Sequence, residues 1–243
     1  MAMRRRPLVM ILISGSTLYL LATIFCLSLG LWLWRETAIL TSLPDPALIS
    51  GKKIVLDAGH GGRDPGAKSR TGLQEKDLNL DIALRLKRYF SRVGVYCIMI
   101  RETDCDHSNE GEQLSHKQRQ DLIHRSRIAN ENGADLYLSI HANSFPQTQY
   151  RGAQTFHDPD SPEAKRLAEA IQGELVRRLG PNRRRAKPGD FRVLNDSRMP
   201  AVTIEVGFLS NPEEAALLAT SEYREKVAEA IFWGVVGYLS RPK

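Results

Sequence analysis

The sequence predicts an α/β domain whose central sheet is mostly parallel and has helices on both faces, preceded by one N-terminal transmembrane helix. The first observation is that, after residue 50, apolar stretches of strand length alternate with stretches of helical periodicity. Strands that alternate with helices are typical of parallel sheets that are covered on both sides. The second observation is a long uncharged run that comes before this alternating pattern.

The uncharged run extends from Leu8 to Trp34. As a helix it would be roughly 40 Å long, which is enough to cross a hydrocarbon core of about 30 Å. Three arginines at positions 4–6 precede it, and such a positive flank keeps the N-terminus in the cytoplasm. The alternative is a cleaved signal peptide, whose apolar region would be shorter and would end in a small-residue cleavage site. We therefore expect residues 1–35 to be an uncleaved signal-anchor in the cytoplasmic membrane, with the rest of the chain on the extracytoplasmic side.

The elements after the anchor follow from composition and periodicity. Residues 36–50 contain two prolines and no clear period, so we expect a linker before a folded domain over residues 51–243. Ser161 is expected to cap a helix, with Pro162 in its first turn. Apolar runs of strand length predict strands at 52–59, 95–101, 134–143, 152–157 and 201–207. Helical periodicity predicts helices at 75–92, 115–130 and 161–179, and one or two more within 213–239.

The charge of the chain argues against a nucleic-acid-binding role. The formal net charge is +6, but four of the 34 basic residues belong to the anchor region, which leaves 30 against 28 acidic residues. A domain that binds nucleic acid is expected to have a basic face of its own. The one dense basic cluster here comprises Arg183, Arg184, Arg185 and Lys187. We expect it to be a solvated loop; contact with an acidic substrate or an anionic polymer is the alternative.

Three reactive side chains come at the ends of predicted strands. His60 follows the first strand, His141 ends the third, and Glu205 lies near the end of the last. In sheets of this kind the carboxyl ends of the strands gather at one edge, where ligands bind. Two histidines and a carboxylate are the ligand set of a catalytic zinc that keeps one coordination position open. The third ligand could be Glu75, at the start of the first helix, or Glu205, and the spacing alone does not rank them.

Five blocks of this sequence resemble, in order, the zinc-dependent N-acetylmuramoyl-L-alanine amidases of the type found in sporulation and cell-division enzymes. Together they span roughly residues 52–240, and they read IVLDAGHGGRDPGA, EKDLNLDIALRL, HRSRIANENGADLYLSIHANS, GAQTFH and MPAVTIEVGFLSNPEEAALL. The resemblance implies that His60, Glu75 and His141 bind one zinc ion, Zn²⁺. It further implies that Glu205 is the catalytic carboxylate and that the central sheet has about six strands, flanked by helices.

The resemblance also implies a reaction, which is hydrolysis of the amide bond between the lactyl group of N-acetylmuramic acid and L-alanine of the peptidoglycan stem peptide. Glu205 would take a proton from water and pass it to the departing amine. Gly59, Gly61 and Gly62 would let a bulky glycan and peptide approach His60. The short, anchored plan is most similar to the germination-specific amidases of spore-forming bacteria, which prepare cortex muramic acid for δ-lactam formation in the spore envelope. Peptidoglycan and the membrane are therefore the expected partners, nucleic acid is not, and an activating partner protein is left open.

Each site residue also has a purely structural interpretation. The two histidines could be ordinary hydrogen-bonded side chains, and Glu75 could be a favourable charge in the first turn of a helix. Glu205 is harder to explain in this way, because burying a carboxylate without a partner is costly. For the whole chain, the alternatives are another zinc hydrolase of the cell wall, such as a peptidase or deacetylase, and a catalytically inactive wall-binding protein.

Other polar residues in the matched blocks receive no catalytic role. The residues that could serve packing, capping or support of the site are Asn79, Arg125 and Asn143. The histidines expected not to be ligands are His107, His116, His124 and His157.

Overall fold

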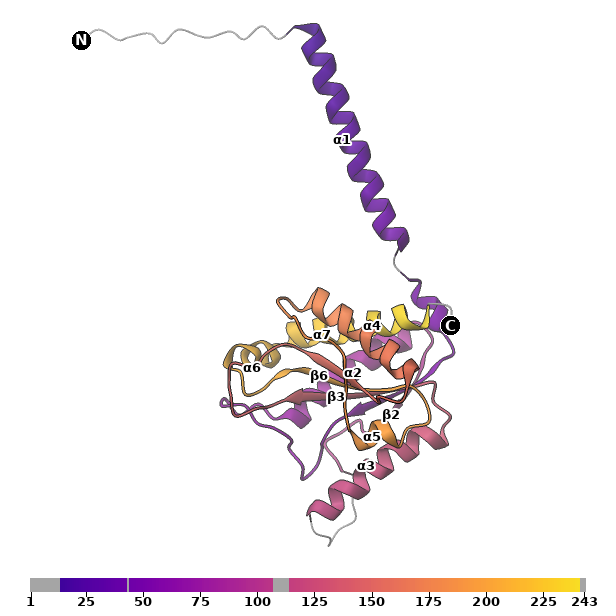
Figure 1. The fold of residues 1–243 in the computed structure, drawn as a ribbon, viewed down its shortest axis with the longest axis vertical. Helices are drawn as coiled ribbons and strands as arrows, with labels where there is room; N and C mark the ends of the chain where they lie inside the picture. The colour runs from indigo at the N-terminus through magenta and orange to yellow at the C-terminus, as the bar shows by residue number, and fades with distance from the viewer. Residues whose placement is uncertain (1–13, 43, 107–113, 241–243) are drawn as a thin grey trace, which may run out of the picture. The chain divides into compact units, whose positions relative to one another are not determined.

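The computed structural model describes residues 14–42, 44–106 and 114–240 (Figure 1). The arginines at positions 4–6, the first residues of the predicted anchor, His107 and the side chain of His116 lie outside the described residues. The chain forms two compact units, Met1–Pro44 and Asp45–Lys243.

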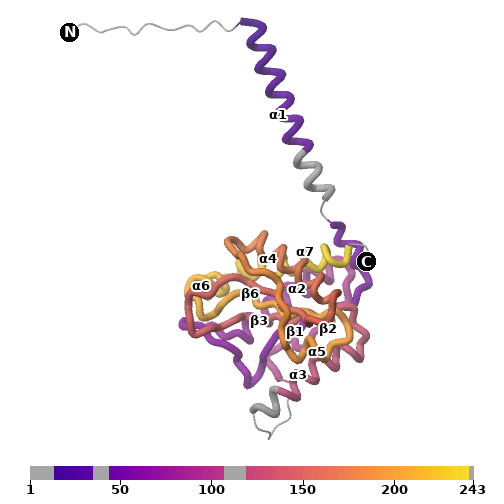
Figure 2. Tube along the Cα trace, in the orientation of Figure 1, coloured from indigo at the N-terminus to yellow at the C-terminus, as the bar shows by residue number. Residues whose placement is uncertain are grey.

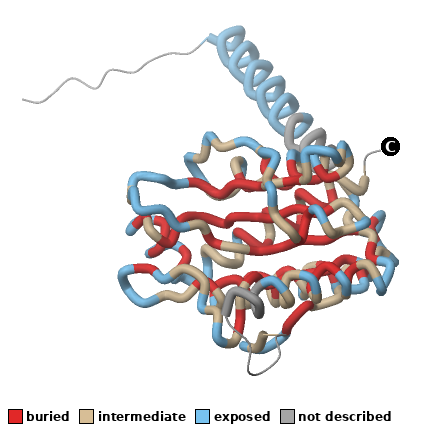
Figure 3. Tube along the Cα trace, turned by 60° about the horizontal axis from the view of Figure 1, so that its bottom comes forward, coloured by how far each residue is buried: buried red, intermediate tan, exposed pale blue. Residues whose placement is uncertain are grey.

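The first unit contains helix α1, Gly15–Ser42. Its segment Gly15–Trp34 is long and apolar enough to cross a membrane, and a signal sequence would have the same character. The described side chains of this segment are exposed along its whole length (Figure 3). Twenty helical residues span about 30 Å, the thickness of a hydrocarbon core.

The segment expected to be a linker, residues 36–50, contains regular structure at both ends. Helix α1 continues to Ser42, and a 3₁₀ helix, η1, covers Pro46–Ile49. The turn forms because the Asp45 side chain accepts a hydrogen bond from the Ala47 backbone amide and proline occupies the first position. Ile49 is fully buried in the core of the second unit, so this segment is already part of the domain.

The second unit is built on a six-stranded sheet with the order β2-β1-β3-β6-β4-β5. All neighbouring pairs are parallel except β4 and β6, which are antiparallel. The strands are β1 (Lys53–Ala58), β2 (Tyr96–Met99), β3 (Leu136–Asn143), β4 (Gln154–His157), β5 (Lys187–Pro188) and β6 (Ala201–Phe208). The predicted α/β class, with a mostly parallel sheet of about six strands, is confirmed.

Helices cover both faces of this sheet (Figures 1 and 2). One face packs against α2 (Glu75–Arg92), α4 (Pro162–Arg178) and α7 (Ser221–Leu239), and Leu56, Leu138 and Ile204 belong to the core there. The other face packs against α3 (Leu114–Glu131) and the short α5 (Arg192–Asn195) through Val55, Tyr137 and Ala201. The central strands are therefore buried along most of their length, as their continuous red colour in Figure 3 shows.

Local sequence signals account for several helix ends. The Ser161 hydroxyl accepts a hydrogen bond from the Ala164 amide and Pro162 begins α4, as predicted. The predicted C-terminal helical region is two helices, α6 (Pro212–Ala219) and α7, because Thr220 leaves the helical conformation and its side chain caps α7. Strand β5 and helix α5 were not predicted, since two to four residues are too short to show a period.

Candidate metal centre and active site

His141 and Glu205 lie side by side on the two central strands β3 and β6. They are register partners in this parallel pair. The register shifts between His141 and Asn143, so the irregularity begins at the histidine. His60 comes two residues after the end of β1, the neighbour of β3 on its other side. Three of the four predicted site residues therefore reach the carboxyl edge of the sheet from three adjacent strands.

Glu75, the first residue of α2, brings a carboxylate between the two histidines. Its Oε1 atom lies 3.1 Å from Nε2 of His60 and 3.0 Å from Nδ1 of His141. One ligand atom from each of the three residues lies within 4.8 Å of the others. Among the described residues this group is the one whose side chains could share a metal ion.

Hydrogen bonds fix the Glu75 carboxylate in this position. Its Oε1 accepts from the Ala142 amide at 3.1 Å and from the Asn79 side chain at 3.3 Å, and its Oε2 accepts from the Ala67 amide at 2.8 Å. Asn79 also donates to the Gly59 carbonyl at 3.2 Å. Asn79, to which the sequence analysis gave no catalytic role, thus ties Glu75 to the loop that follows β1.

The ring of His60 is held by Asp64, a residue for which the sequence predicted no role. His60 Nδ1 lies 2.9 Å from Asp64 Oδ2, while Asp64 Oδ1 accepts from the Gly66 amide at 3.0 Å. A carboxylate at one ring nitrogen fixes the proton there and leaves the other nitrogen free to bind a metal. Nε2 is therefore the nitrogen of His60 that could bind a metal. The signal available in the sequence for Asp64 was its position four residues after His60.

Glycines in the loop after β1 make room for the side chains of the candidate metal group. A Cβ at Gly59 would overlap the imidazole of His141, and a Cβ at Gly66 would lie 2.6 Å from Oε2 of Glu75. Gly66 has a φ of 63°, and His60 has a φ of 61°, which is uncommon for a residue other than glycine. The glycines near His60 were expected to admit substrate, but at Gly59 the space is taken by the His141 side chain.

The protonation of the cluster reflects its geometry. Burial disfavours protonated His60, but the hydrogen bonds and negative charge of Glu75 and Asp64 outweigh burial and raise the pKa of His60 to about 9. Burial alone would raise the pKa of Glu75, yet the hydrogen bonds from His141 and His60 lower it. The carboxylate therefore stays ionised and the site attracts positive charge. Two imidazole nitrogens and a carboxylate oxygen match the donor set of a zinc site, so these residues fit that metal.

Glu205 differs from Glu75 in having no such support. The residue is 9 % exposed, and its Oε2 is buried without a hydrogen-bond partner among the described residues. Burial, with a further contribution from the charge of Glu75, raises the pKa of Glu205 to about 7 against the opposing effect of His141. A carboxyl group with a pKa near neutrality can both accept and donate a proton at physiological pH.

A buried ion pair supports the loop that follows β1 and contains His60. Arg125 of α3 pairs with Asp57 of β1, and both side chains are almost completely buried. Asp57 also accepts hydrogen bonds from Tyr137 at 2.7 Å and Ser139 at 2.9 Å. Arg125 donates to the His60 carbonyl at 3.0 Å. Arg125, which was assigned no catalysis, thus positions the backbone of a predicted ligand.

A cavity of about 240 Å³ lies beside the two histidines, between the sheet and helices α3 and α5. Its lining includes His60 and His141 together with Leu122, Phe191 and Thr203. This mixed lining gives a substrate with polar and apolar parts room next to the cluster.

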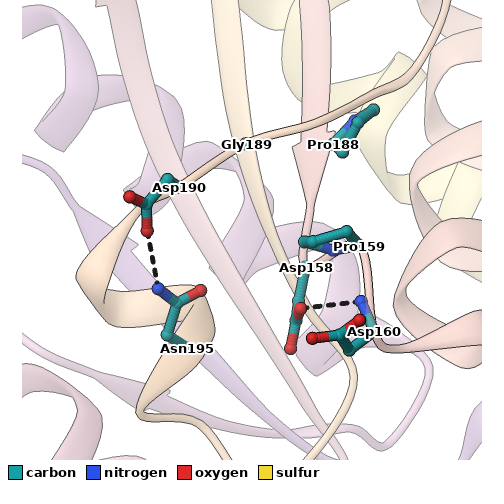
Figure 4. Close-up of a pocket in the computed structure, with 7 residues that line it drawn as sticks. All are labelled: Asp158, Pro159, Asp160, Pro188, Gly189, Asp190 and Asn195. Atoms are coloured by element: carbon teal, nitrogen blue, oxygen red, sulfur yellow. Dashed lines mark hydrogen bonds between the residues drawn. The ribbon is translucent and has the colours of Figure 1, made fainter.

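A second pocket, of about 540 Å³, lies at the opposite edge of the sheet and contains three aspartates (Figure 4). His157 at the end of β4 pairs with Val202 near the start of β6, so Asp158 lies at the amino edge of β6, away from Glu205. In this pocket Asp158 accepts from the Asp160 amide and Asp190 accepts from the Asn195 side chain. His157 is buried near it, with Nδ1 2.9 Å from the Asp158 carbonyl oxygen, and is not part of the candidate metal group.

The fold and the cluster together define the class of protein: a hydrolase on an α/β sheet, with two imidazoles and two carboxylates gathered at the carboxyl edge of its strands. Residues 54–236 match the family described as N-acetylmuramoyl-L-alanine amidase. The chain belongs to this family, and it is an enzyme that acts on peptidoglycan.

Several relatives of known name or structure are similar over most of the chain. A germination-specific N-acetylmuramoyl-L-alanine amidase of Bacillus subtilis (strain 168) is 42% identical over 195 residues, which are 79% of this chain and 81% of that protein. The solved CwlD amidase from Clostridioides difficile, in complex with the GerS lipoprotein, gives a TM-score of 0.76 at 42% identity and covers 78% of this chain and 99% of that one. The crystal structure of an N-acetylmuramoyl-L-alanine amidase from Clostridium difficile 630 gives a TM-score of 0.69 at 32% identity. It covers 77% of this chain and 96% of that one.

Proposed function

We propose that this enzyme is a zinc-dependent amidase that hydrolyses the bond between the lactyl group of N-acetylmuramic acid and L-alanine of the stem peptide. His60, Glu75 and His141 hold the zinc ion, and Glu205 is the catalytic acid and base. The observation that carries the proposal is the convergence of three ligand atoms within 4.8 Å beside Glu205, whose Oε2 is buried and without a hydrogen-bond partner in the described structure.

The residues of the chain then have distinct tasks. When bound, zinc supplies a Lewis acid that polarises a carbonyl oxygen and makes water a better nucleophile near neutral pH. Glu205 takes a proton from the attacking water and gives it to the nitrogen of the departing L-alanine. Asp64 keeps His60 in the tautomer whose Nε2 is free. The cavity beside the histidines admits part of the substrate.

The biological setting is proposed from the relatives. One relative that covers most of this chain is named a germination-specific amidase. We therefore place the activity in the spore cortex, where removal of the stem peptide prepares muramic acid for δ-lactam formation. A single hydrolytic step at the lactyl amide leaves the free carboxyl group that a lactam-forming enzyme requires.

The location of the enzyme is proposed from its first helix. Gly15–Trp34 anchors the chain in the cytoplasmic membrane, and the domain that begins near Asp45 acts on the extracytoplasmic side. The sequence places the anchor at residues 1–35, a linker at 36–50 and the catalytic domain at 51–243, whereas the compact second unit already begins at Asp45. Cleavage of the helix as a signal sequence is the alternative, and the mass of the mature protein separates the two.

A protein partner is proposed on the same basis. The CwlD amidase, which shares 42% identity with this chain, was solved in complex with the GerS lipoprotein. We propose that this amidase also assembles with a lipoprotein outside the membrane. Co-purification of the full chain from detergent-solubilised membranes tests the assembly, and recovery of the enzyme without any lipoprotein would count against it.

One experiment tests the activity and its metal together. The full chain, purified in detergent, is incubated with peptidoglycan, and the products are identified by mass spectrometry while zinc is measured on the same sample. Release of intact stem peptides with one zinc ion per chain is expected. Cleavage inside the stem peptide would instead indicate a peptidase, loss of acetyl groups a deacetylase, and unchanged peptidoglycan a wall-binding protein.

A further inference from the structure

Three aromatic side chains form a cluster at the carboxyl edge of the sheet. Phe208 is buried, with 1 % exposure, whereas Phe145 and Tyr150 above it are 48 % and 43 % exposed. The ring centroids of Phe145 and Tyr150 are 5.4 Å apart, and those rings lie 6.1 Å and 6.3 Å from the ring of Phe208. We call Phe145 and Tyr150 the aromatic platform.

The loop that carries the platform is firmly held, so the exposed rings do not result from a loose segment. The Phe145 amide donates to the Ser210 hydroxyl at 3.0 Å, and the Asn211 side chain donates to the Thr148 carbonyl at 2.8 Å. At the end of the loop, the Gly152 amide donates to Glu214 at 2.7 Å. The chain thus maintains two exposed aromatic rings in a fixed place.

Arg184 stacks on Phe208, the buried ring that neighbours both rings of the platform. Its guanidinium lies over the ring of Phe208, 4.6 Å from the centroid, and its Nε donates to the Arg151 carbonyl at 2.6 Å. The basic cluster was expected to be a solvated loop. The structure has Arg183, Arg185 and Lys187 exposed, but Arg184 turns inward to the aromatic residues.

Phe145 of the platform and the neighbouring Phe208 lie a few residues beyond the site residues of strands β3 and β6. Phe145 follows His141 by four residues, and Phe208 follows Glu205 by three. Asn143 and Phe208 are register partners, and the Leu209 amide donates to the Asn143 carbonyl at 2.8 Å. The platform and the candidate metal cluster are therefore at the same edge of the same sheet.

The chemistry of the substrate indicates what the platform binds. An enzyme that cuts between muramic acid and L-alanine must hold a glycan on one side of the bond and a peptide on the other. A pyranose ring has a face of C–H groups that stacks on an aromatic ring and a rim of hydroxyl and amide groups that stays in water. Rigid aromatic rings with one exposed face provide contact area at low entropic cost.

We propose that Phe145 and Tyr150 are the glycan-binding surface of this amidase, on which a sugar of the strand stacks while the neighbouring muramic acid is at the catalytic cluster. This inference rests on the family's action on peptidoglycan and not on the identity of the metal. The peptide side of the substrate then lies elsewhere, towards the cavity beside the histidines.

The test uses peptide-free glycan strands as a competitive inhibitor of the full-length amidase in detergent. Phe145→Ala and Tyr150→Ala are compared with Tyr96→Ala, which removes a 67 % exposed aromatic at the start of edge strand β2. The two platform variants are expected to weaken inhibition by glycan strands roughly tenfold each. They should raise KM for strand-attached stem peptides and leave kcat within about twofold, while Tyr96→Ala changes neither.

Two further measurements keep the test decisive. Phe145→Trp and Tyr150→Phe, which retain an aromatic face, should restore glycan inhibition, and the melting temperature shows that each variant is folded. Folded alanine variants that retain wild-type inhibition by glycan strands would overturn the proposal. Folded variants that lose inhibition by free stem peptide instead would also overturn it, because the surface would then belong to the peptide side. Absence of amidase activity in the wild type would contradict the proposed function, whereas glycan binding by the platform would still be measurable directly, by isothermal titration of the same variants with peptide-free glycan strands.

Discussion

Glu205 is the register partner of His141 on the neighbouring strand, yet its Oε2 atom is buried without a hydrogen-bond partner among the described residues. Leaving a buried carboxylate unsatisfied costs free energy. The buried carboxylate of Glu205, next to two histidines and a second carboxylate, therefore lowers the free energy of unfolding of the domain. Removing the carboxylate should therefore affect activity and stability in opposite directions.

The first prediction concerns turnover. Glu205→Gln should lower kcat by roughly 10²- to 10⁴-fold, because the amide cannot exchange the proton between water and the leaving amine. Zinc content should stay at the wild-type level, since the three ligands are unchanged. Activity on peptidoglycan and metal content are measured on one sample. A variant that retains more than a tenth of wild-type kcat would contradict the role of Glu205.

The second prediction concerns the stability of the metal-free domain as a function of pH. The folded-state pKa of Glu205 is about 7 against an ordinary value of 4.5, so ionisation disfavours folding as pH rises. Metal-free Glu205→Gln should match the wild type at pH 4 and be more stable at pH 8 by up to about 3 kcal/mol. Urea unfolding of residues 45–243 measures this difference. Equal stabilities at pH 8 would mean that Glu205 is well solvated or paired.

The third prediction concerns the metal ligands. His141→Ala should lose stoichiometric zinc, because two ligands remain where three are needed. His124→Ala is the matched control, since His124 contacts Arg127 on the surface of α3 and does not belong to the cluster. Metal analysis after dialysis distinguishes the two variants. A fully zinc-loaded His141→Ala protein would rule out this ligand set.

The fourth prediction concerns Asp64. Asp64→Asn should weaken zinc binding roughly 10- to 100-fold, because the carboxylate that fixes the His60 tautomer is lost. Asp104→Asn is the control, since Asp104 accepts from the Gly62 amide in the same loop without contacting a ligand. Titration against a chelator of known affinity gives both values. Equal zinc affinities for the two variants would show that Asp64 only shapes the loop.

The fifth prediction concerns the pH dependence of zinc binding. His60 must lose its proton when the metal binds, and in the metal-free protein its pKa is raised to about 9. The apparent zinc affinity should therefore keep rising from pH 6.5 to about 9, by up to tenfold per pH unit. An ordinary histidine would give a plateau above about pH 6.5. Chelator competition across this range decides, and a plateau near pH 6.5 would contradict the Glu75 and Asp64 contacts to His60.

The parts of the fold that have a period or a cap could be predicted from the sequence. Helix α2 begins at Glu75 and ends at Arg92 as expected, because its apolar residues recur at helical spacing. Strands β1, β3 and β6 are continuous apolar runs, so their carboxyl ends, and with them His60, His141 and Glu205, could be brought to one edge by a general rule of parallel sheets.

What could not be predicted depends on contacts between distant residues. The spacing does not rank Glu75 and Glu205 as the third ligand. The structure places Glu75 between both histidines, whereas Oε2 of Glu205 has no hydrogen-bond partner in the described structure. In the sequence, Arg101 is only the last residue of a predicted strand. In the structure its side chain donates to the carbonyls of Ala58 and Gly59 and so holds the loop that leads to His60. Such contacts have no periodicity that one sequence could reveal.

The most direct test of the central claim is a crystal structure of the zinc-loaded enzyme with data collected at the zinc absorption edge. One anomalous peak is expected among Nε2 of His60, the Glu75 carboxylate and Nδ1 of His141, with Glu205 facing it. A strong peak at any other position, or full zinc occupancy with these three side chains turned away from the ion, would contradict the account.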